Sequence, residues 1–164
     1  MNYYQRPDVE QSILSDVFAG AGGFQSLHTP DYARTDFIVA LGRQHYNVEV
    51  KGRIGKHYNI AFFRRFPPFF DRSKVEYLTA EAERTGSRAL FVHRTSDGWL
   101  IALDAKDIPP AGELGDIQRR APRNGAPAKD RPTKGYYTPL ASCKVRPPAD
   151  APETDENAAL EAEW

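Results

Sequence analysis

The sequence predicts one domain of the α/β (α+β) class, with a mixed central β-sheet of about five strands flanked by helices. Helix-like and strand-like hydrophobic periods alternate over roughly the first hundred residues. The length of 164 residues is normal for one domain with a substantial core. We place the domain at residues 1–146, with a loop or insertion at 109–135 and a disordered acidic tail at 147–164.

The first helix is expected over residues 8–18, where Pro7-Asp8 is a start signal. Its apolar residues recur at helical spacing: Val9, Ile13, Leu14, Val17 and Phe18. Glu10 borders this stripe. A carboxylate at the edge of a core is costly unless it is paired or bound to a metal, but the helix dipole also favours an acid in the first turn. Both roles stay open for Glu10.

A hairpin is expected next, with strands at 36–41 and 45–51 joined by a three-residue turn, 42–44. Residues two apart on a strand share a face, so Glu49 and Lys51 lie side by side, away from the neighbouring valines. Asp36 begins the first strand and therefore lies opposite the far end of the second. Two carboxylates and a lysine converge on one patch.

This patch suits phosphodiester hydrolysis. Asp and Glu oxygens hold Mg²⁺ together with phosphate oxygens and water, and a lysine can orient the attacking water and offset charge in the transition state. The same residues also fit a surface hairpin with a cross-strand ion pair, worth less than about 1 kcal/mol. The Glu-x-Lys pattern alone does not separate the two interpretations.

The remaining elements complete the sheet. After a strand near 24–27 and the hairpin, we expect a strand at 57–63, a helix at 71–85, strands at 88–93 and 99–103, and a last strand within 136–145. Asp71 or Ser73 caps the second helix and Gly86 ends it. Lys74, in its first turn, either reaches a phosphate or metal-bound water or stays solvated.

Residues 64–70 combine Arg64 and Arg65 with phenylalanines and a Pro-Pro pair. Arginines beside aromatic rings are typical of surfaces that contact phosphates and stack on bases. The phenylalanines equally suit the core or an interface between two copies of the chain. Because an uncovered cluster of phenylalanines would form a large exposed apolar patch, an interface is favoured for some of them.

The formal net charge is zero, but basic and acidic residues are concentrated in different segments of the chain. Residues 34–94 carry twelve Lys and Arg against six Asp and Glu, and residues 117–146 carry eight against one. Residues 149–164 carry six acids and no base. A basic body with an acidic end favours an anionic partner such as DNA.

Composition excludes several classes. The single cysteine, Cys143, rules out an intrachain disulfide and a cysteine-based zinc cage. No run of eighteen apolar residues and no signal peptide is present, so we expect a soluble, cytoplasmic protein without a membrane partner. The histidines are scattered singly, which argues against a histidine-based nuclease site: His28, His45, His57 and His93.

The order of these features resembles the PD-(D/E)xK nucleases, and among them the Holliday-junction resolvases of the archaeal and RecU-like kinds. The resemblance covers residues 8–108 and rests on Glu10 in a first helix, Asp36 starting a strand and Glu49-Val50-Lys51 ending the next. It implies a restriction-endonuclease-like fold and hydrolysis of DNA, with branched DNA among the expected substrates, during recombination or repair. It also implies Mg²⁺ as the cofactor, with Mn²⁺ able to substitute for it, and a homodimer that cuts two strands.

Carried over to this sequence, the resemblance implies that Asp36 and Glu49 are metal ligands and that Lys51 orients the water. It also implies that Glu10 is a further ligand or a supporting group. Asp31, in a literal Pro-Asp pair, is an alternative to Asp36. The expected DNA contacts are Arg34, Arg53, Lys56, Arg64, Arg65 and Lys74. A phage- or restriction-type or general DNA nuclease would use the same catalytic residues. A non-catalytic DNA-binding or inhibitory protein is the alternative of a different class.

Overall fold

The computed structural model describes residues 7–19, 23–29, 35–52, 56–117 and 133–151. The elements in chain order are α1 (Pro7–Val17), β1 (Gln25–His28), β2 (Phe37–Leu41), β3 (Gln44–Gly52), α2 (Ile60–Arg65), β4 (Phe69–Asp71), α3 (Arg72–Thr85), β5 (Arg88–Arg94), β6 (Leu100–Asp104), η1 (Ala105–Asp107), α4 (Ile108–Ala111), β7 (Glu113–Ile117), β8 (Thr133–Tyr137), η2 (Leu140–Ser142) and β9 (Lys144–Arg146). Within these ranges, no helix has the length and apolarity needed to cross a membrane.

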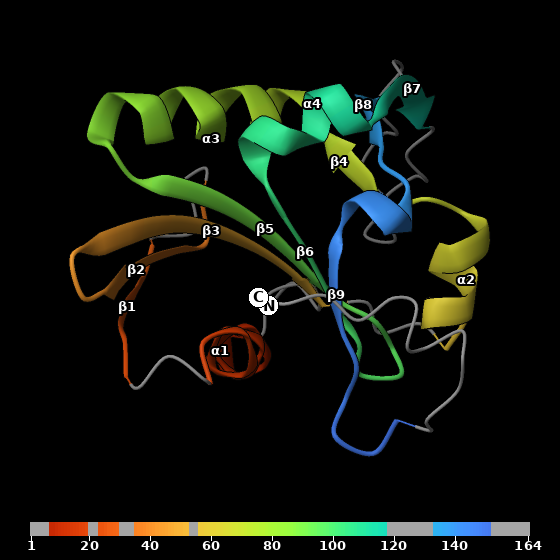
Figure 1. The fold of residues 1–164 in the computed structure, drawn as a ribbon, viewed down its shortest axis with the longest axis horizontal. Helices are drawn as coiled ribbons and strands as arrows, with labels where there is room; N and C mark the ends of the chain where they lie inside the picture. Colours follow the sequence, from red (N-terminus) through yellow and green to blue (C-terminus); the bar gives the residue numbers. More distant parts are fainter. Residues whose placement is uncertain (1–6, 20–22, 30–34, 53–55, 118–132, 152–164) are drawn as a thin grey trace, which may run out of the picture.

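Six strands form the central sheet, in the order β1-β2-β3-β5-β6-β9. The β3–β5 pair is parallel and the other pairs are antiparallel. Helix α1 covers one face of the sheet and α3 covers the other (Figure 1). The predicted mixed sheet flanked by helices is confirmed, with six strands where about five were expected.

Each face of the sheet has its own core. On one face, Ile13 and Leu14 of α1 pack with Val48 and Val50 of β3. On the other face, buried side chains of α3 and β5 form a second cluster that includes Leu78. Because neighbouring residues of a strand point to opposite faces, the valines point toward α1 and Glu49 points toward α3.

The β2–β3 hairpin is tighter than expected. Leu41 pairs with Gln44, so the turn contains two residues, Gly42 and Arg43. Gly42 has a φ of 59°, which suits the first central position of a type II′ hairpin turn. The ladder then runs to the Phe37–Val48 pair. Asp36 therefore stands opposite Glu49, as predicted.

The strand expected at 57–63 is wrong, because this segment contains helix α2. The Asn59 side chain caps the helix by accepting a hydrogen bond from the Phe62 N–H at 2.9 Å. The Asp97 carboxylate accepts a second bond, from the Ile60 N–H at 3.1 Å. Ile60 and Phe63 are buried at helical spacing. The pattern that resembled strand alternation is one buried face of a short helix.

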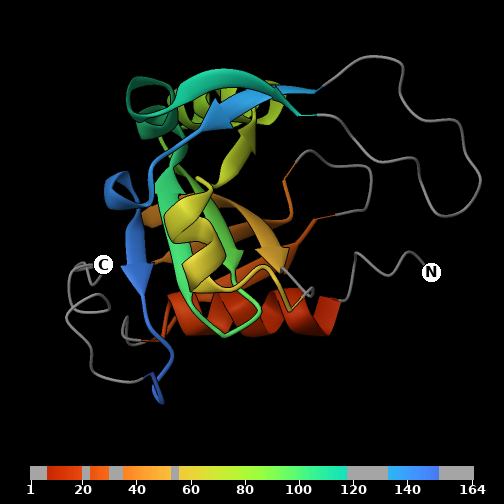
Figure 2. The same cartoon turned by 90° about the vertical axis from the view of Figure 1, so that its right-hand side faces the viewer.

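The predicted loop or insertion at 109–135 has regular secondary structure in the parts that the structure describes. Helix α4 and strands β7 and β8 occupy its two ends, and β8 also pairs with β4 to form a three-stranded sheet, β4-β8-β7. This second sheet lies on the α3 side of the molecule, with α1 on the opposite side (Figure 2). Gly135 allows the close approach, since a Cβ there would lie 2.3 Å from the Phe69 ring.

The end of the chain also differs in detail from the expectation. The last strand expected within 136–145 is divided, because β8 ends at Tyr137 and β9 begins at Lys144 after the short helix η2. Helix α3 is confirmed, with Asp71 as its cap and Gly86 in the left-handed conformation at its end. Of the disordered acidic tail expected at 147–164, the structure describes 147–151, where the Ala151 N–H donates to the Pro148 carbonyl at 3.1 Å and Ala151 packs against the core. The rest of the expected tail lies outside the described residues.

Candidate functional site

Asp36 is fixed at the point where β2 enters the sheet. Its backbone N–H donates to the Val48 carbonyl at 3.2 Å. Its carboxylate Oδ2 accepts a hydrogen bond from the backbone N–H of Val50 at 2.7 Å. The backbone pairing of β2 with β3 begins at Phe37. Beyond that point, the Asp36 side chain accepts the hydrogen bond from β3 that a strand carbonyl would otherwise accept. Asp36 is thereby held beside the last residues of β3.

Two threonines support this position. Thr29 lies opposite Asp36 at the end of β1, and both its N–H and its hydroxyl donate to the Asp36 carbonyl, at 2.9 and 3.0 Å. The Thr29 hydroxyl also contacts the Thr35 carbonyl. The Thr35 hydroxyl donates to the Val48 carbonyl at 3.2 Å. The backbone on both sides of Asp36 is therefore tied to β1 and β3. Sequence reasoning missed Thr29, although the register of β1 against β2 would have identified it.

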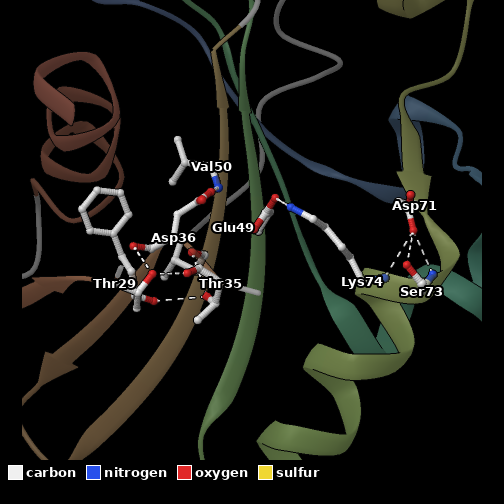
Figure 3. A network of polar contacts seen from close by, with 10 residues as sticks. Thr29, Thr35, Asp36, Glu49, Val50, Asp71, Ser73 and Lys74 are labelled. Carbon is white, nitrogen blue, oxygen red and sulfur yellow. Dashed lines mark hydrogen bonds and ion pairs between the residues drawn. The ribbon is translucent and has the colours of Figure 1, made fainter. Parts of the chain in front are cut away.

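Glu49 is the most deeply buried acid of this site. It is 3% exposed, and its Oε1 forms an ion pair with the Nζ of Lys74, in the first turn of α3. Figure 3 shows the Lys74 side chain extending from α3 toward the carboxylate on β3. Oε2 is buried and has no hydrogen-bond partner among the residues that the structure describes. One oxygen of a buried carboxylate is thus left for a further cation.

The surroundings of Glu49 raise its pKa from 4.5 to about 7. Burial is the main cause, because it disfavours the charged form, and the neighbouring charge of Asp36 adds to it. Lys74 and Lys51 act in the opposite direction. Two carboxylates therefore lie together in a poorly solvated site, and the two lysines offset only part of their negative charge. A divalent cation there would stabilise both carboxylates in their ionised form.

Lys51 lies two residues beyond Glu49 on the same strand and therefore on the same face. It pairs across the parallel ladder with His93 of β5, as Glu49 pairs with Phe91. His93 is buried and its ring lies 5.0 Å from that of Phe70. Lys51 thus lies two residues from Glu49 on β3, next to the strand position of a buried, ring-packed histidine. Its influence on the pKa of Glu49 places it in electrostatic contact with the site.

Glu10 is buried on α1, which packs on the face of the sheet opposite to Lys74. Helix α1 approaches the end of β3, where a Cβ on Gly52 would lie 3.7 Å from Val9. Within the described residues, no three His, Cys, Asp or Glu side chains form a group that could hold a metal. The structure groups Asp36 with Glu49, and Glu10 as a third ligand stays a prediction.

The donor set nevertheless fits Mg²⁺. This ion keeps several waters and is commonly held by one or two carboxylates together with substrate phosphates. Asp36 and Glu49 supply two carboxylates, and the unpartnered Oε2 of Glu49 supplies a buried oxygen that a cation would satisfy. Lys74 pairs with the other oxygen of Glu49, so the negative charge on Oε2 is only partly neutralised. The residues present therefore match a site completed by solvent and phosphate.

The other expected site residues divide into two groups. Arg34, Arg53 and the alternative ligand Asp31 lie outside the described residues. Lys56, Arg64 and Arg65 lie in or just before α2, beyond the carboxyl ends of β3 and β5, where Lys56 and Arg65 are exposed. Lys74 contacts Glu49 directly, so it belongs to the site more closely than the sequence indicated.

Comparisons with known proteins give a structural likeness but no match in sequence. No protein-family model and no curated protein matches the chain. Among solved structures, it is similar to Hjc, a Holliday junction resolvase from the archaeal hyperthermophile Archaeoglobus fulgidus. The sequence identity is 15% and the TM-score 0.47, over 77% of this chain and 85% of that chain. A likeness at this level does not place the chain in a family, so its chemistry is argued from its own residues.

Proposed function

We propose that this protein is a metal-dependent endonuclease that hydrolyses DNA phosphodiesters. The observation that carries the proposal is the buried Glu49 carboxylate, which has one oxygen on Lys74, one oxygen without a described partner, and Asp36 opposite it. An acid in such surroundings is costly for a structural ion pair alone. The same acid, beside a second carboxylate and two lysines, is suited to hold a cation against a phosphate.

Asp36 and Glu49 would hold Mg²⁺, which when bound neutralises phosphate charge and lowers the pKa of water. The chain supplies the remaining functions. Lys51 orients the attacking water and offsets the negative charge that develops on the phosphate oxygens. The water gives one proton to the solvent as its oxygen forms a bond to phosphorus, the opposite ester P–O bond breaks, and the released sugar oxygen takes up a proton. Lys74 holds the Glu49 carboxylate in place.

The finer proposal is selectivity for branched DNA. It is supported by the order of Glu10, Asp36, Glu49 and Lys51, which resembles that of the Holliday-junction resolvases. A homodimer suits a substrate in which two strands are cut. The exposed Leu27 and Ile38, 64% and 43% exposed, pair in register on β1 and β2 and form an apolar surface at the sheet edge. Light scattering at working concentration tests the dimer, which a monomer mass would contradict.

The test of the activity is cleavage of three DNA substrates, with Mg²⁺ or with EDTA: supercoiled plasmid, linear duplex and a synthetic four-way junction. Glu49→Gln removes the charge and retains the shape, and it should abolish cleavage. Glu76→Gln, on the exposed side of α3, is the matched control and should cleave normally. Absence of Mg²⁺-dependent cleavage of every substrate would overturn the proposal and favour a non-catalytic DNA-binding protein.

The three substrates also separate the kinds of nuclease. Paired symmetric nicks in the junction alone support a resolvase-like enzyme, and cleavage of all three indicates a general nuclease. Binding in the absence of Mg²⁺ should weaken steeply as salt rises, because contacts between lysine or arginine and phosphate release counterions. A flat salt response would count against DNA as the partner.

A further inference from the structure

A row of aromatic rings that the catalytic site does not use starts before helix α2, at His57, passes through Phe62 of the helix and ends just after it, at Phe66. The His57 and Phe62 rings lie 6.2 Å apart, and the Phe62 and Phe66 rings 5.1 Å apart. Phe62 is half-buried and packs against the core beneath, whereas Phe66 is 49% exposed. We call His57, Phe62 and Phe66 the α2 ring row. The two exposed rings, His57 and Phe66, both contact Phe62, which packs on the core. In this they differ from an isolated surface phenylalanine.

Positive charge surrounds the α2 ring row. The Arg65 guanidinium lies over the Phe66 ring, 5.4 Å from its centre. Lys56 is exposed immediately before His57, and Arg64 lies beside Arg65. The acid that contacts the start of α2, Asp97, is occupied by hydrogen bonds from the Ile60 N–H and the Thr95 hydroxyl. The surface therefore suits a partner that combines flat apolar groups with negative charge.

The α2 ring row is also close to the catalytic site along the chain. Phe66 and Phe70 are four residues apart, which limits the separation of their Cα atoms to about 14 Å at about 3.5 Å per residue. The Phe70 ring packs on His93, which pairs with Lys51. Helix α2 stands apart from α1 and α3 at one side of the molecule, so neither helix covers it (Figure 1).

We infer that the α2 ring row binds an unpaired nucleobase, with Arg65 and Lys56 contacting the phosphates beside it. Bases stack on aromatic side chains whatever their sequence, and arginine adds a cation–π contribution. In a duplex the base faces are already stacked on one another, so a single-stranded segment fits this surface and a continuous duplex does not. The inference rests on the proposed function only in that the substrate is DNA.

The test measures binding to a fluorescent single strand of about twenty nucleotides and to its duplex, by anisotropy in EDTA so that no cleavage occurs. Phe66→Ala should weaken single-strand binding about tenfold, since stacking contributes on the order of 1–3 kcal/mol per base. Duplex affinity should stay within about twofold, as for an ordinary surface substitution. Leu114→Ala is the matched control, because Leu114 is 53% exposed on β7.

A second variant tests stacking itself. Phe66→Trp retains a flat ring, so it should keep the single-strand affinity, and its added fluorescence should be quenched by oligothymidine. Retained binding without quenching would overturn the inference, as would a Phe66→Ala protein with unchanged single-strand affinity. Equal loss for single strand and duplex, with a fall in mass by sedimentation, would instead assign this surface to contact between copies of the chain.

The outcome is separable from that of the proposed function. If the wild-type protein cleaves DNA with Mg²⁺ but Phe66→Ala binds single strands normally, only this inference fails. If no cleavage occurs yet single-strand binding depends on Phe66, only the proposed activity fails. Thermal unfolding of both Phe66 variants checks that they fold, which the half-exposed position of this side chain favours.

Discussion

Lys74 of α3 forms an ion pair with Glu49 of β3, so the first turn of a helix on one face of the sheet is tied to an acid buried within it. The pair joins residues 25 positions apart. It partly offsets the burial of Glu49 and gives Lys74 a place in the site in addition to the DNA contact predicted from the sequence.

Replacing Lys74 should alter both the rate of cleavage and its pH dependence. Lys74→Met removes a charge that lowers the pKa of Glu49, so this pKa should rise further and ionised Glu49 should require a higher pH. We expect the rate of cleavage at neutral pH to fall about 10²-fold. The acidic limb of the pH–rate profile should shift toward higher pH. Lys106→Met, at an exposed position, is the control. A uniform fall at all pH values would contradict this role.

The stability of the metal-free protein should depend on pH through Glu49. The pKa of Glu49 in the folded protein, about 7, lies above its ordinary value of 4.5, so the folded state binds this proton more tightly than the unfolded state. The free energy of unfolding should therefore fall as pH rises from about 4.5 to 7, by up to about 3 kcal/mol.

Urea unfolding in EDTA at pH 5 and pH 8 measures this effect. Other titrating groups are common to both proteins, so the difference between wild type and Glu49→Gln isolates Glu49. Wild type should lose more stability than the variant between the two pH values. Parallel pH dependence in the two proteins would show that Glu49 is not the group responsible. Added Mg²⁺ should stabilise wild type at pH 8 more than Glu49→Gln.

The choice between Asp36 and Asp31 can be settled by paired variants. The anchored position of Asp36 opposite Glu49 predicts that Asp36→Ala abolishes cleavage and leaves DNA binding largely intact. Asp31→Ala should cleave normally. An inactive Asp31→Ala beside an active Asp36→Ala would reverse the assignment. Glu10→Gln in the same plasmid-nicking assay tests the third predicted ligand.

Thr29 should act as a positioning residue for Asp36. Thr29→Val removes the hydroxyl that donates to the Asp36 carbonyl. The Asp36 carbonyl keeps the Thr29 N–H, so we expect a loss of stability of about 0.5–1.5 kcal/mol for the lost hydroxyl hydrogen bond, and a higher Mg²⁺ concentration for half-maximal cleavage. Thr29→Ser keeps the hydroxyl and should restore the Mg²⁺ dependence. A Thr29→Val protein that is destabilised but has normal Mg²⁺ dependence would limit Thr29 to a structural role.

Much of the fold could be predicted from the sequence because its strongest elements are locally encoded. The periodic apolar residues of α1 and α3 and the hairpin of β2 and β3 each carry their own signal. The second sheet could not be predicted, because β4 has three residues and pairs with β8, more than sixty positions later. The pattern of helix α2 predicts a strand because its buried face has only two residues, and one of its N–H groups donates to the distant Asp97 carboxylate.

The same distinction applies to the site. Asp36, Glu49 and Lys51 could be placed together because strand periodicity and hairpin register are local rules. The Lys74 contact with Glu49 depends on how α3 crosses the sheet, and no sequence spacing encodes that. Glu10 was placed by its position in a helix, but helix position does not determine which face of the sheet the helix covers.

The hydrogen bond from the Val50 N–H to the Asp36 carboxylate has a consequence for how this protein can vary. The acid is held by hydrogen bonds to β3 and to Thr29 at the end of β1. We therefore expect changes between Thr29 and Thr35 to leave Asp36 in place, provided that these two threonines are kept. Under the proposed function, libraries randomised at 30 and 32–34 should change which DNA is cut while both candidate ligands, Asp31 and Asp36, are kept.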